Sequence, residues 1–331
     1  MRGPRLTAWA GVLGLVATSV AAVQAGVGAL PVGAATAAPA PVPPFACGQL
    51  SPGAPAAGRP VKATTALGDV QATISGTAAT PIGEGIATVH NVDIDISVGG
   101  RVAVHGPLVT PIGRFIGPGG PALASLVTSR SSSDRPLCVA DFGGSHPETA
   151  VLVGIFTMGA HCCYWVDAYL VGPGGAHLPP VQHQIGDPGM ELRQLGGYTA
   201  VLTADDAFAY AFTAYAFSGM PLEILELRGT VFTNTTRQYP NLVAADAAAW
   251  WQRFEQAQAR SSEDPTHGTG ALAPWVADEC LLSQGAKAWA TVDRLNSEGK
   301  LSSKSADGWP SGTTYVKDLR TFLMGHGYCG S

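Results

Sequence analysis

The segment at residues 150–170, AVLVGIFTMGAHCCYWVDAYL, constrains the fold of this chain more than any other stretch. It begins with closely spaced β-branched residues, passes through Gly-Ala-His-Cys-Cys at 159–163, and continues with aromatic and β-branched residues. Residues of these kinds favour strands, and a glycine between two such runs marks a turn. The segment therefore predicts two neighbouring strands, 150–158 and 164–171, joined by a tight turn and buried on at least one face.

Six cysteines lie beyond the N-terminal apolar segment, and two of them are adjacent. An even number of cysteines in an exported chain indicates disulfides. Cys280 and Cys329 are placed to tie the last helix to the helices before it. Cys47 and Cys138 stand at the starts of two β regions. Among about fifteen pairings, these positions favour Cys280–Cys329, Cys47–Cys138 and, by exclusion, Cys162–Cys163. Buried free thiols and, for the adjacent pair, metal ligation are the alternatives.

The N-terminus has the pattern of a secretory signal peptide. Two arginines precede an apolar run from about residue 8 to residue 30, and small residues follow it. We expect cleavage after one of residues 25–38, so that residues 1–38 hold the signal peptide and the mature protein is secreted or extracellular. The run is also long enough to span a bilayer, so an uncleaved N-terminal anchor is the alternative.

The charge of the chain limits its partners. Without residues 1–38 it carries 17 Lys and Arg against 24 Asp and Glu, a net charge of −7. A mildly acidic chain lacks the basic surface that binds nucleic acid or anionic membranes. We therefore expect no nucleic-acid partner, and no membrane association beyond the alternative anchor. The partner that remains is an unknown extracellular or cell-envelope ligand.

Turn signals and changes of period divide the chain. Residues 39–60 are rich in Pro, Ala and Gly, and predict a flexible lead-in that is held only if Cys47 is bonded. Alternating apolar residues at 92–98 predict a half-buried strand. The expected parts are a signal peptide at 1–38, the lead-in at 39–60, an N-terminal β region at 61–135, a β-repeat-like domain with a closing helix at 136–260, and a helical bundle at 271–331.

The expected fold class is mainly β with a C-terminal helical bundle. Short strands with frequent turn signals predict an antiparallel meander, a sandwich or part of a propeller-like core. After the last strand the spacing becomes helical, and the first helix carries Trp250 and Phe254 on one face. Pro274 is expected at the first position of the second helix. Further helices are predicted at about 286–296 and 312–325.

Two longer motifs, GGSHPETAVLVGIFTMGAHCCYWVDAYLV and TADDAFAYAFTAYAF, resemble exported actinobacterial proteins of unknown function with an FG-GAP or VCBS-like, integrin-type β-repeat region. The resemblance covers about residues 138–255 and implies strands that carry Asp-rich, calcium-binding loops. Asp141 and the pair Pro147 and Glu148 match such a loop, whereas the second loop position, 195–198, has no carboxylate. Calcium takes about six to eight oxygen ligands, so we expect the β frame without the ion, and no cofactor.

The candidate metal ligands are His161, Cys162, Cys163 and Asp141. Structural zinc usually takes separated ligand pairs such as Cys-x-x-Cys, and adjacent residues of a strand point to opposite faces. Only a turn would allow both thiols to converge on one ion. We therefore predict no metal site, and a disulfide role for the adjacent cysteines.

Asp205 and Asp206 are the candidates for general acid and base catalysis. They precede Phe208, Tyr210 and Phe212, whose alternation predicts a strand. Carboxylates at such a position more often cap a turn by accepting hydrogen bonds from backbone N–H groups. The chain has no Gly-x-Ser-x-Gly motif, so no catalytic residue is assigned, and His161, Asp205 and Asp206 remain functional candidates.

Two classes of function follow from these observations. The first is a non-enzymatic secreted or cell-envelope-associated protein, a binding or structural module on a disulfide-bonded β scaffold. The alternative is a secreted hydrolase with an acidic-residue site that no motif reveals. Paired carboxylates at the mouth of a pocket would favour the hydrolase.

Overall fold

The fold was obtained as a computed structural model. It describes residues 44–51, 57–81, 87–109, 122–123, 135–143, 149–157, 161–172, 175–176, 178–187, 189–260, 264, 266–302 and 308–329. The expected signal peptide at 1–38 lies outside these residues.

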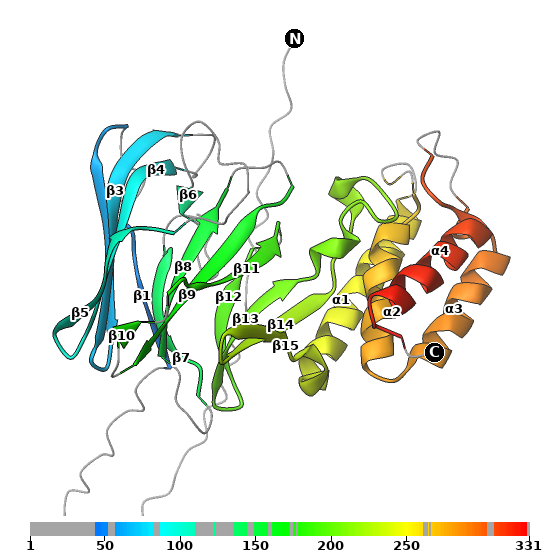
Figure 1. Ribbon diagram of the computed structural model, residues 1–331. Coiled ribbons are helices and arrows are strands. Elements are labelled where there is room, and N and C mark those ends of the chain that lie inside the picture. Colours follow the sequence, from blue (N-terminus) through cyan, green and yellow to red (C-terminus); the bar gives the residue numbers. More distant parts are fainter. Residues whose placement is uncertain are drawn as a thin grey trace, which may run out of the picture. The chain divides into compact units, whose positions relative to one another are not determined.

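Most strands belong to one antiparallel sheet (Figure 1). Its main path runs β1-β7-β8-β6-β4-β3-β2, with β5 on β4, β9 on β8, and both β10 and β11 on β9. An isolated bridge between Ser51, just after β1, and Lys62 of β2 brings the two ends of this path together. The bounds are β1 Phe45–Gly48, β2 Pro60–Leu67, β3 Val70–Pro81, β4 Ala87–Val98, β5 Arg101–Pro107, β6 Ala122–Leu123, β7 Leu137–Asp141, β8 Thr149–Phe156, β9 Tyr164–Gly172, β10 Gly175–Ala176 and β11 Val181–Gly186.

The segment at residues 150–170 forms the expected pair of strands. β8 and β9 pair antiparallel, with Ile155 opposite Trp165 and Phe156 opposite Tyr164. Cys163, just before β9, has a positive φ of 89°, which a tight turn requires. Every residue of β8 after Thr149 is buried, so this strand packs on both faces.

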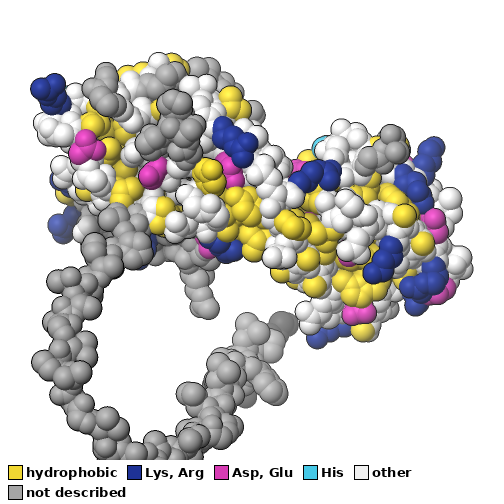
Figure 2. Space-filling view, turned by 90° about the horizontal axis from the view of Figure 1, so that it is seen from below, with side chains coloured by type: hydrophobic (Ala, Val, Ile, Leu, Met, Phe, Trp, Pro, Cys, Tyr) yellow, Lys and Arg dark blue, Asp and Glu magenta, His cyan; other side chains and the backbone are white. Residues whose placement is uncertain are grey.

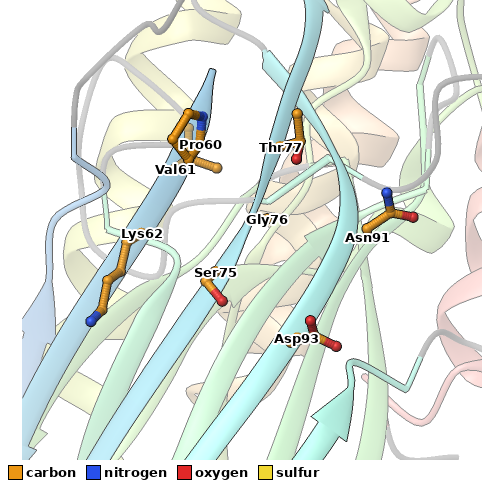
Figure 3. A pocket seen from close by; sticks show the side chains of 8 residues that line it. All are labelled: Pro60, Val61, Lys62, Ser75, Gly76, Thr77, Asn91 and Asp93. Carbon is orange, nitrogen blue, oxygen red and sulfur yellow. The ribbon is translucent and has the colours of Figure 1, made fainter. Parts of the chain in front are cut away.

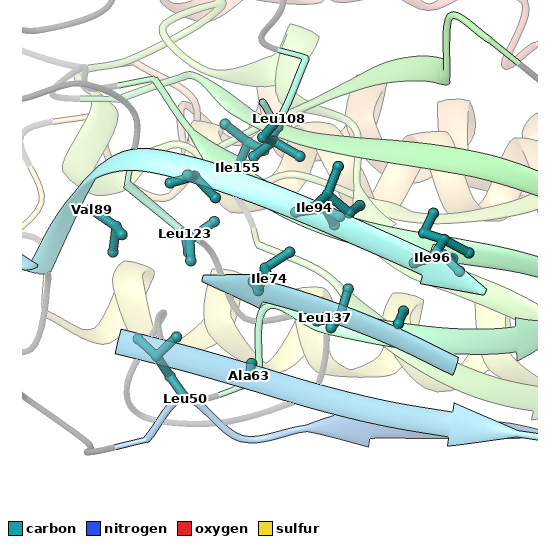
Figure 4. Close-up of a cluster of buried hydrophobic side chains, with 14 of the residues drawn as sticks. Leu50, Ala63, Ile74, Val89, Ile94, Ile96, Leu108, Leu123, Leu137 and Ile155 are labelled. Carbon is teal, nitrogen blue, oxygen red and sulfur yellow. The ribbon is translucent and has the colours of Figure 1, made fainter. Parts of the chain in front are cut away.

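One large hydrophobic core lies between β2, β3 and β4 on one side and β6, β7 and β8 on the other. Figure 4 shows Ile74, Ile94 and Ile96 gathered with Leu137 and Ile155 in this core. The pattern of β2 alternates strictly between exposed and buried residues, as a strand with one face on a core must. Each fully buried side chain of this size contributes roughly 1.5–3 kcal/mol relative to an exposed one.

A second sheet of four strands lies between the large sheet and the helices. It runs in the order β12 (Glu191–Leu195), β13 (Tyr198–Ala204), β14 (Leu222–Arg228) and β15 (Val231–Asn234). One face, with Val201 and Leu225, packs on Leu152 and Val166 of the large sheet. The other face, with Ile224, packs on Leu242 of helix α1. The chain is therefore mainly β with a C-terminal helical region, as the sequence predicts.

Four helices follow: α1 Pro240–Ala259, α2 Thr269–Leu281, α3 Gly285–Ser297 and α4 Gly312–Gly325. Pro274 does not begin α2 but lies inside it. A proline at this position has no N–H for the carbonyl of Gly270. That carbonyl instead accepts a hydrogen bond from the N–H of Gly219, with N···O 3.0 Å, which is why the helix continues. Among the described residues, no helix is long and apolar enough to cross a membrane.

Two of the domain boundaries predicted from the sequence do not separate structural units. The lead-in at 39–60 contains β1, which pairs with β7 and places Cys47 opposite Cys138. The division between 61–135 and 136–260 falls within one sheet, because β6 pairs with both β4 and β8. The boundaries were predicted from local amino-acid composition. Strand pairing, in contrast, joins segments that are far apart in sequence, so a change of composition need not separate two parts of a sheet.

Candidate functional site

The six cysteines form the three disulfides that the sequence favours. The Cα atoms are 4.1 Å apart in Cys47–Cys138, 3.7 Å in Cys162–Cys163 and 5.0 Å in Cys280–Cys329. The thiols of the adjacent pair are consumed in their own bond and are not available as metal ligands. In the described part of the chain, no group of three or more His, Cys, Asp or Glu side chains could hold a metal ion.

Non-reducing peptide mapping of the exported protein tests this pairing. We expect one peptide that joins Cys47 to Cys138, one that joins Cys280 to Cys329, and an internally bonded peptide that contains both Cys162 and Cys163. The mass of this peptide is lower than that of its reduced form by the mass of two hydrogen atoms. A peptide that links Cys162 or Cys163 to Cys47 or Cys138 would contradict the adjacent pair, and free thiols at both positions would restore the metal hypothesis.

Asp141, another of the metal candidates, has a local role. Its Oδ1 accepts a hydrogen bond from the N–H of Gly143 at 2.8 Å, an Asx turn at the end of β7. The rest of the loop that resembles a calcium site, 144–148, lies outside the described residues.

The aromatic run after Asp205 does not form the expected strand. Asp205 caps a single-turn 3₁₀-helix, η1 (Asp206–Phe208), because its Oδ1 accepts from the N–H of Ala207 at 3.0 Å. Its other oxygen, Oδ2, accepts from the hydroxyl of Tyr328 at 2.8 Å. Phe208 and Phe212 then enter the helical core, while Tyr210 adopts a positive φ of 60° and stays 48% exposed. The alternation of aromatic residues therefore comes from a turn in which Phe208 and Phe212 point into the core and Tyr210 points to the surface.

The structure brings two of the sequence motifs together. The ring of His161, in the β8–β9 turn, stacks on Tyr215 with the ring centroids 3.8 Å apart and an interplanar angle of 25°. Tyr210 lies at the edge of the same group, 5.9 Å from His161 and 5.6 Å from Tyr215. We call His161, Tyr210 and Tyr215 the ring cluster. Because Tyr215 belongs to a second 3₁₀-helix, η2 (Tyr215–Phe217), the cluster joins the large sheet to the segment before β14.

Two carboxylates lie beside the ring cluster. Asp187 directly follows β11, and the carboxylate of Asp206 lies so close to the backbone of Gly186 that a Cβ at Gly186 would overlap it. Burial raises the pKa of Asp206, and the charges of Asp205 and Asp187 raise it further. Burial also raises the pKa of Asp187, whereas nearby His161 lowers it. His161 therefore interacts electrostatically with Asp187, and Asp187 with Asp206.

Glu223 of β14 extends this acidic group towards the helices. Burial and the charge of Asp205 raise its pKa to about 7, although a hydrogen bond from Asn234 at 3.0 Å acts in the opposite direction. The sequence analysis did not find Glu223 or Asp187. Neither lies in a motif, and only the pairing of distant strands places them near Asp205 and Asp206.

A family model described as the sll0997 C-terminal domain matches residues 243–327, which run from α1 to just after α4. Over 223 residues, the chain is 25% identical to the "Probable thylakoid lumen protein sll0997" of Synechocystis sp.. That alignment covers 61% of this chain and 65% of the length of the Synechocystis protein. No solved structure matches.

Proposed function

We propose that this chain is a non-enzymatic binding module that works outside the cytoplasm, as a secreted or cell-envelope-associated protein, and that the ring cluster is its ligand surface. The three disulfides support this location, since such bonds persist in oxidising compartments. The name of the distant relative, a probable thylakoid lumen protein, is in keeping with it. The signal-peptide pattern of residues 1–38 supplies the route.

One observation supports the ring cluster as the ligand surface. His161 stacks on Tyr215 beside exposed Tyr210, and the same His161 lies within electrostatic range of the carboxyl group of Asp187, which in turn acts on Asp206. Tyrosine is enriched at binding surfaces because its rigid ring combines a large contact area with a polar tip. Carboxylates beside aromatic rings suit a ligand that carries hydroxyl or basic groups. The disulfide Cys162–Cys163 restrains the turn that carries His161.

The distribution of charge supports a partner other than nucleic acid. Figure 2 shows Lys and Arg side chains scattered over the visible face among hydrophobic and uncharged groups, and not gathered into one basic area. Nucleic-acid binding requires such an area to neutralise phosphates. We therefore propose an uncharged or basic extracellular ligand.

Thermal shift of the mature protein against a panel of glycans and of neutral and basic peptides tests this proposal. A ligand at one hundred times its Kd stabilises the folded state by about 2.7 kcal/mol. We expect Tyr210→Ala to abolish the shift and the matched control Tyr198→Ala to keep it, since Tyr198 is 41% exposed but lies outside the ring cluster. A ligand whose shift is the same in wild type and Tyr210→Ala binds elsewhere and contradicts the proposed surface.

A secreted hydrolase is the second candidate, and the pair Asp187 and Asp206 favours it. Burial raises the pKa of both carboxyl groups, and a general acid must keep its proton at the working pH. Turnover of fluorogenic glycosides or esters that disappears in Asp206→Asn, and persists in Tyr210→Ala, would favour this candidate over the binding module.

A further inference from the structure

A separate pocket opens on the strands β2, β3 and β4, with a volume of about 590 Å³. Figure 3 shows Lys62 of β2 and Asp93 of β4 on either side of Ser75 of β3. Thr77 and Asn91 add a hydroxyl and an amide, and Pro60 adds an apolar wall. Small-molecule sites commonly have volumes of about 300–1,000 Å³ and a few polar groups that fix the ligand.

The strand register places the three central side chains in one row. Lys62 is opposite Ser75, and Ser75 is opposite Asp93. Residues directly opposite each other in neighbouring strands point to the same face. The neighbours Val61 and Ile74 are buried in the core, so the row faces away from it. The two charged residues are thus fixed at opposite ends of one polar row.

A β-bulge shapes the upper end of the pocket. Ser75 is opposite Asp93, but Thr77 is opposite His90, so β4 has one more residue than β3 in this interval. Asn91, in the bulge, has a positive φ of 49°. A Cβ at Gly76 would lie 2.8 Å from the carbonyl oxygen of His90, so only glycine allows this approach of the two backbones. Bulges of this kind re-aim side chains and often lie next to functional sites.

The charges of the row are not neutralised within the described part of the chain. Neither Lys62 nor Asp93 takes part in an ion pair there, in contrast to Asp95 on the same face, which pairs with His105. The charge of Asp93 also acts on His105, but more weakly than that of Asp95. Two strand spacings of about 4.8 Å separate the backbones of Lys62 and Asp93 by roughly 10 Å. The neutral Ser75 between them can serve as a hydrogen-bonding group.

From this arrangement we infer that the pocket binds a zwitterionic ligand of the size of a dipeptide, with its carboxylate at Lys62 and its ammonium group at Asp93. An extended dipeptide spans at most about 7 Å, which the flexible Lys62 side chain can reach from the far end of the row. Ser75, Thr77 and Asn91 then face the peptide bond, whose N–H and C=O both need partners. This site is independent of the ring cluster.

Isothermal titration of the mature full chain with L-alanyl-L-alanine tests the inference. The probe is compared with its N-acetyl form, which keeps only the carboxylate, and with its amide, which keeps only the ammonium group. The test variants are Lys62→Gln and Asp93→Asn. The controls Arg101→Gln, at the start of β5, and Asp69→Asn, in the turn between β2 and β3, make the same charge changes at exposed positions outside the pocket.

We expect the dipeptide to bind, and each test variant to weaken it at least fivefold, while the controls leave it unchanged. Lys62→Gln should weaken the N-acetyl form but not the amide, and Asp93→Asn should do the reverse. Unchanged melting temperatures show that these surface variants fold. Absence of binding at about 10 mM dipeptide, or equal loss for both blocked forms, would overturn the inference.

Discussion

Asp278→Asn should raise the free energy of unfolding at pH 7 by about 2–4 kcal/mol. Asp278 lies in α2 with 0% of its surface exposed, and the side chain of Asp246 is close enough to interact with its carboxyl group. Burial, and then the nearby charge of Asp246 in α1, raise its pKa from 3.8 to about 10. Glu279 acts in the same direction, and Tyr328 also lies within electrostatic range. The folded protein therefore keeps this carboxyl group protonated at neutral pH.

The raised pKa determines how stability depends on pH. The folded state holds a proton that the unfolded state releases above its ordinary pKa of 3.8. The stabilising contribution is therefore complete below about pH 4 and is lost progressively as the pH rises towards about 10. Asparagine is neutral throughout, so the variant should lack this slope and match the wild type near pH 4.

Urea unfolding at several pH values measures this difference. Asp318→Asn makes the same substitution at an exposed position of α4, and is expected to change the free energy of unfolding by less than about 0.5 kcal/mol. A wild type whose stability between pH 4 and pH 8 follows that of Asp278→Asn would show that the buried carboxyl group does not titrate as described.

Phe254→Ala should lower the free energy of unfolding by about 3–5 kcal/mol. Phe254 is 2% exposed, its ring centroid lies 5.4 Å from that of Trp251, and it packs against the connection to α2 so closely that a Cβ at Gly268 would lie 2.9 Å from its Cδ2. Truncation leaves a cavity that this rigid interface between α1 and α2 cannot close.

The midpoint of denaturant unfolding measures the effect. Gln252→Ala, on the exposed side of the same helix, serves as the control and should leave the midpoint within the range of surface substitutions. A midpoint for Phe254→Ala close to that of Gln252→Ala would show that α1 is not part of the cooperative core.

Local patterns were enough to predict the parts of the fold whose neighbours in space are also neighbours in sequence. The strands of the β8–β9 hairpin contact each other across a short turn, so the run at 150–170 already contained both partners. Helix α4 occupies Gly312–Gly325, as its helical spacing predicts, because its hydrogen bonds lie within the segment. The disulfides could also be predicted from the sequence, because the cysteine count is even and the positions of the cysteines favour few of the possible pairings.

Tertiary contacts decided what local patterns left open. The run at Phe208–Phe212 has the period of a strand, yet Phe208 packs on Phe322 of α4, with ring centroids 4.9 Å apart, and the cap by Asp205 begins a turn instead. Pro274 remains inside α2 because Gly219, distant in sequence, uses the carbonyl that proline leaves unpaired. The ring cluster and the row of Lys62, Ser75 and Asp93 likewise exist only after strands and loops have paired. Propensity acts within a few residues, whereas burial and hydrogen bonding of distant groups contribute more free energy and override it.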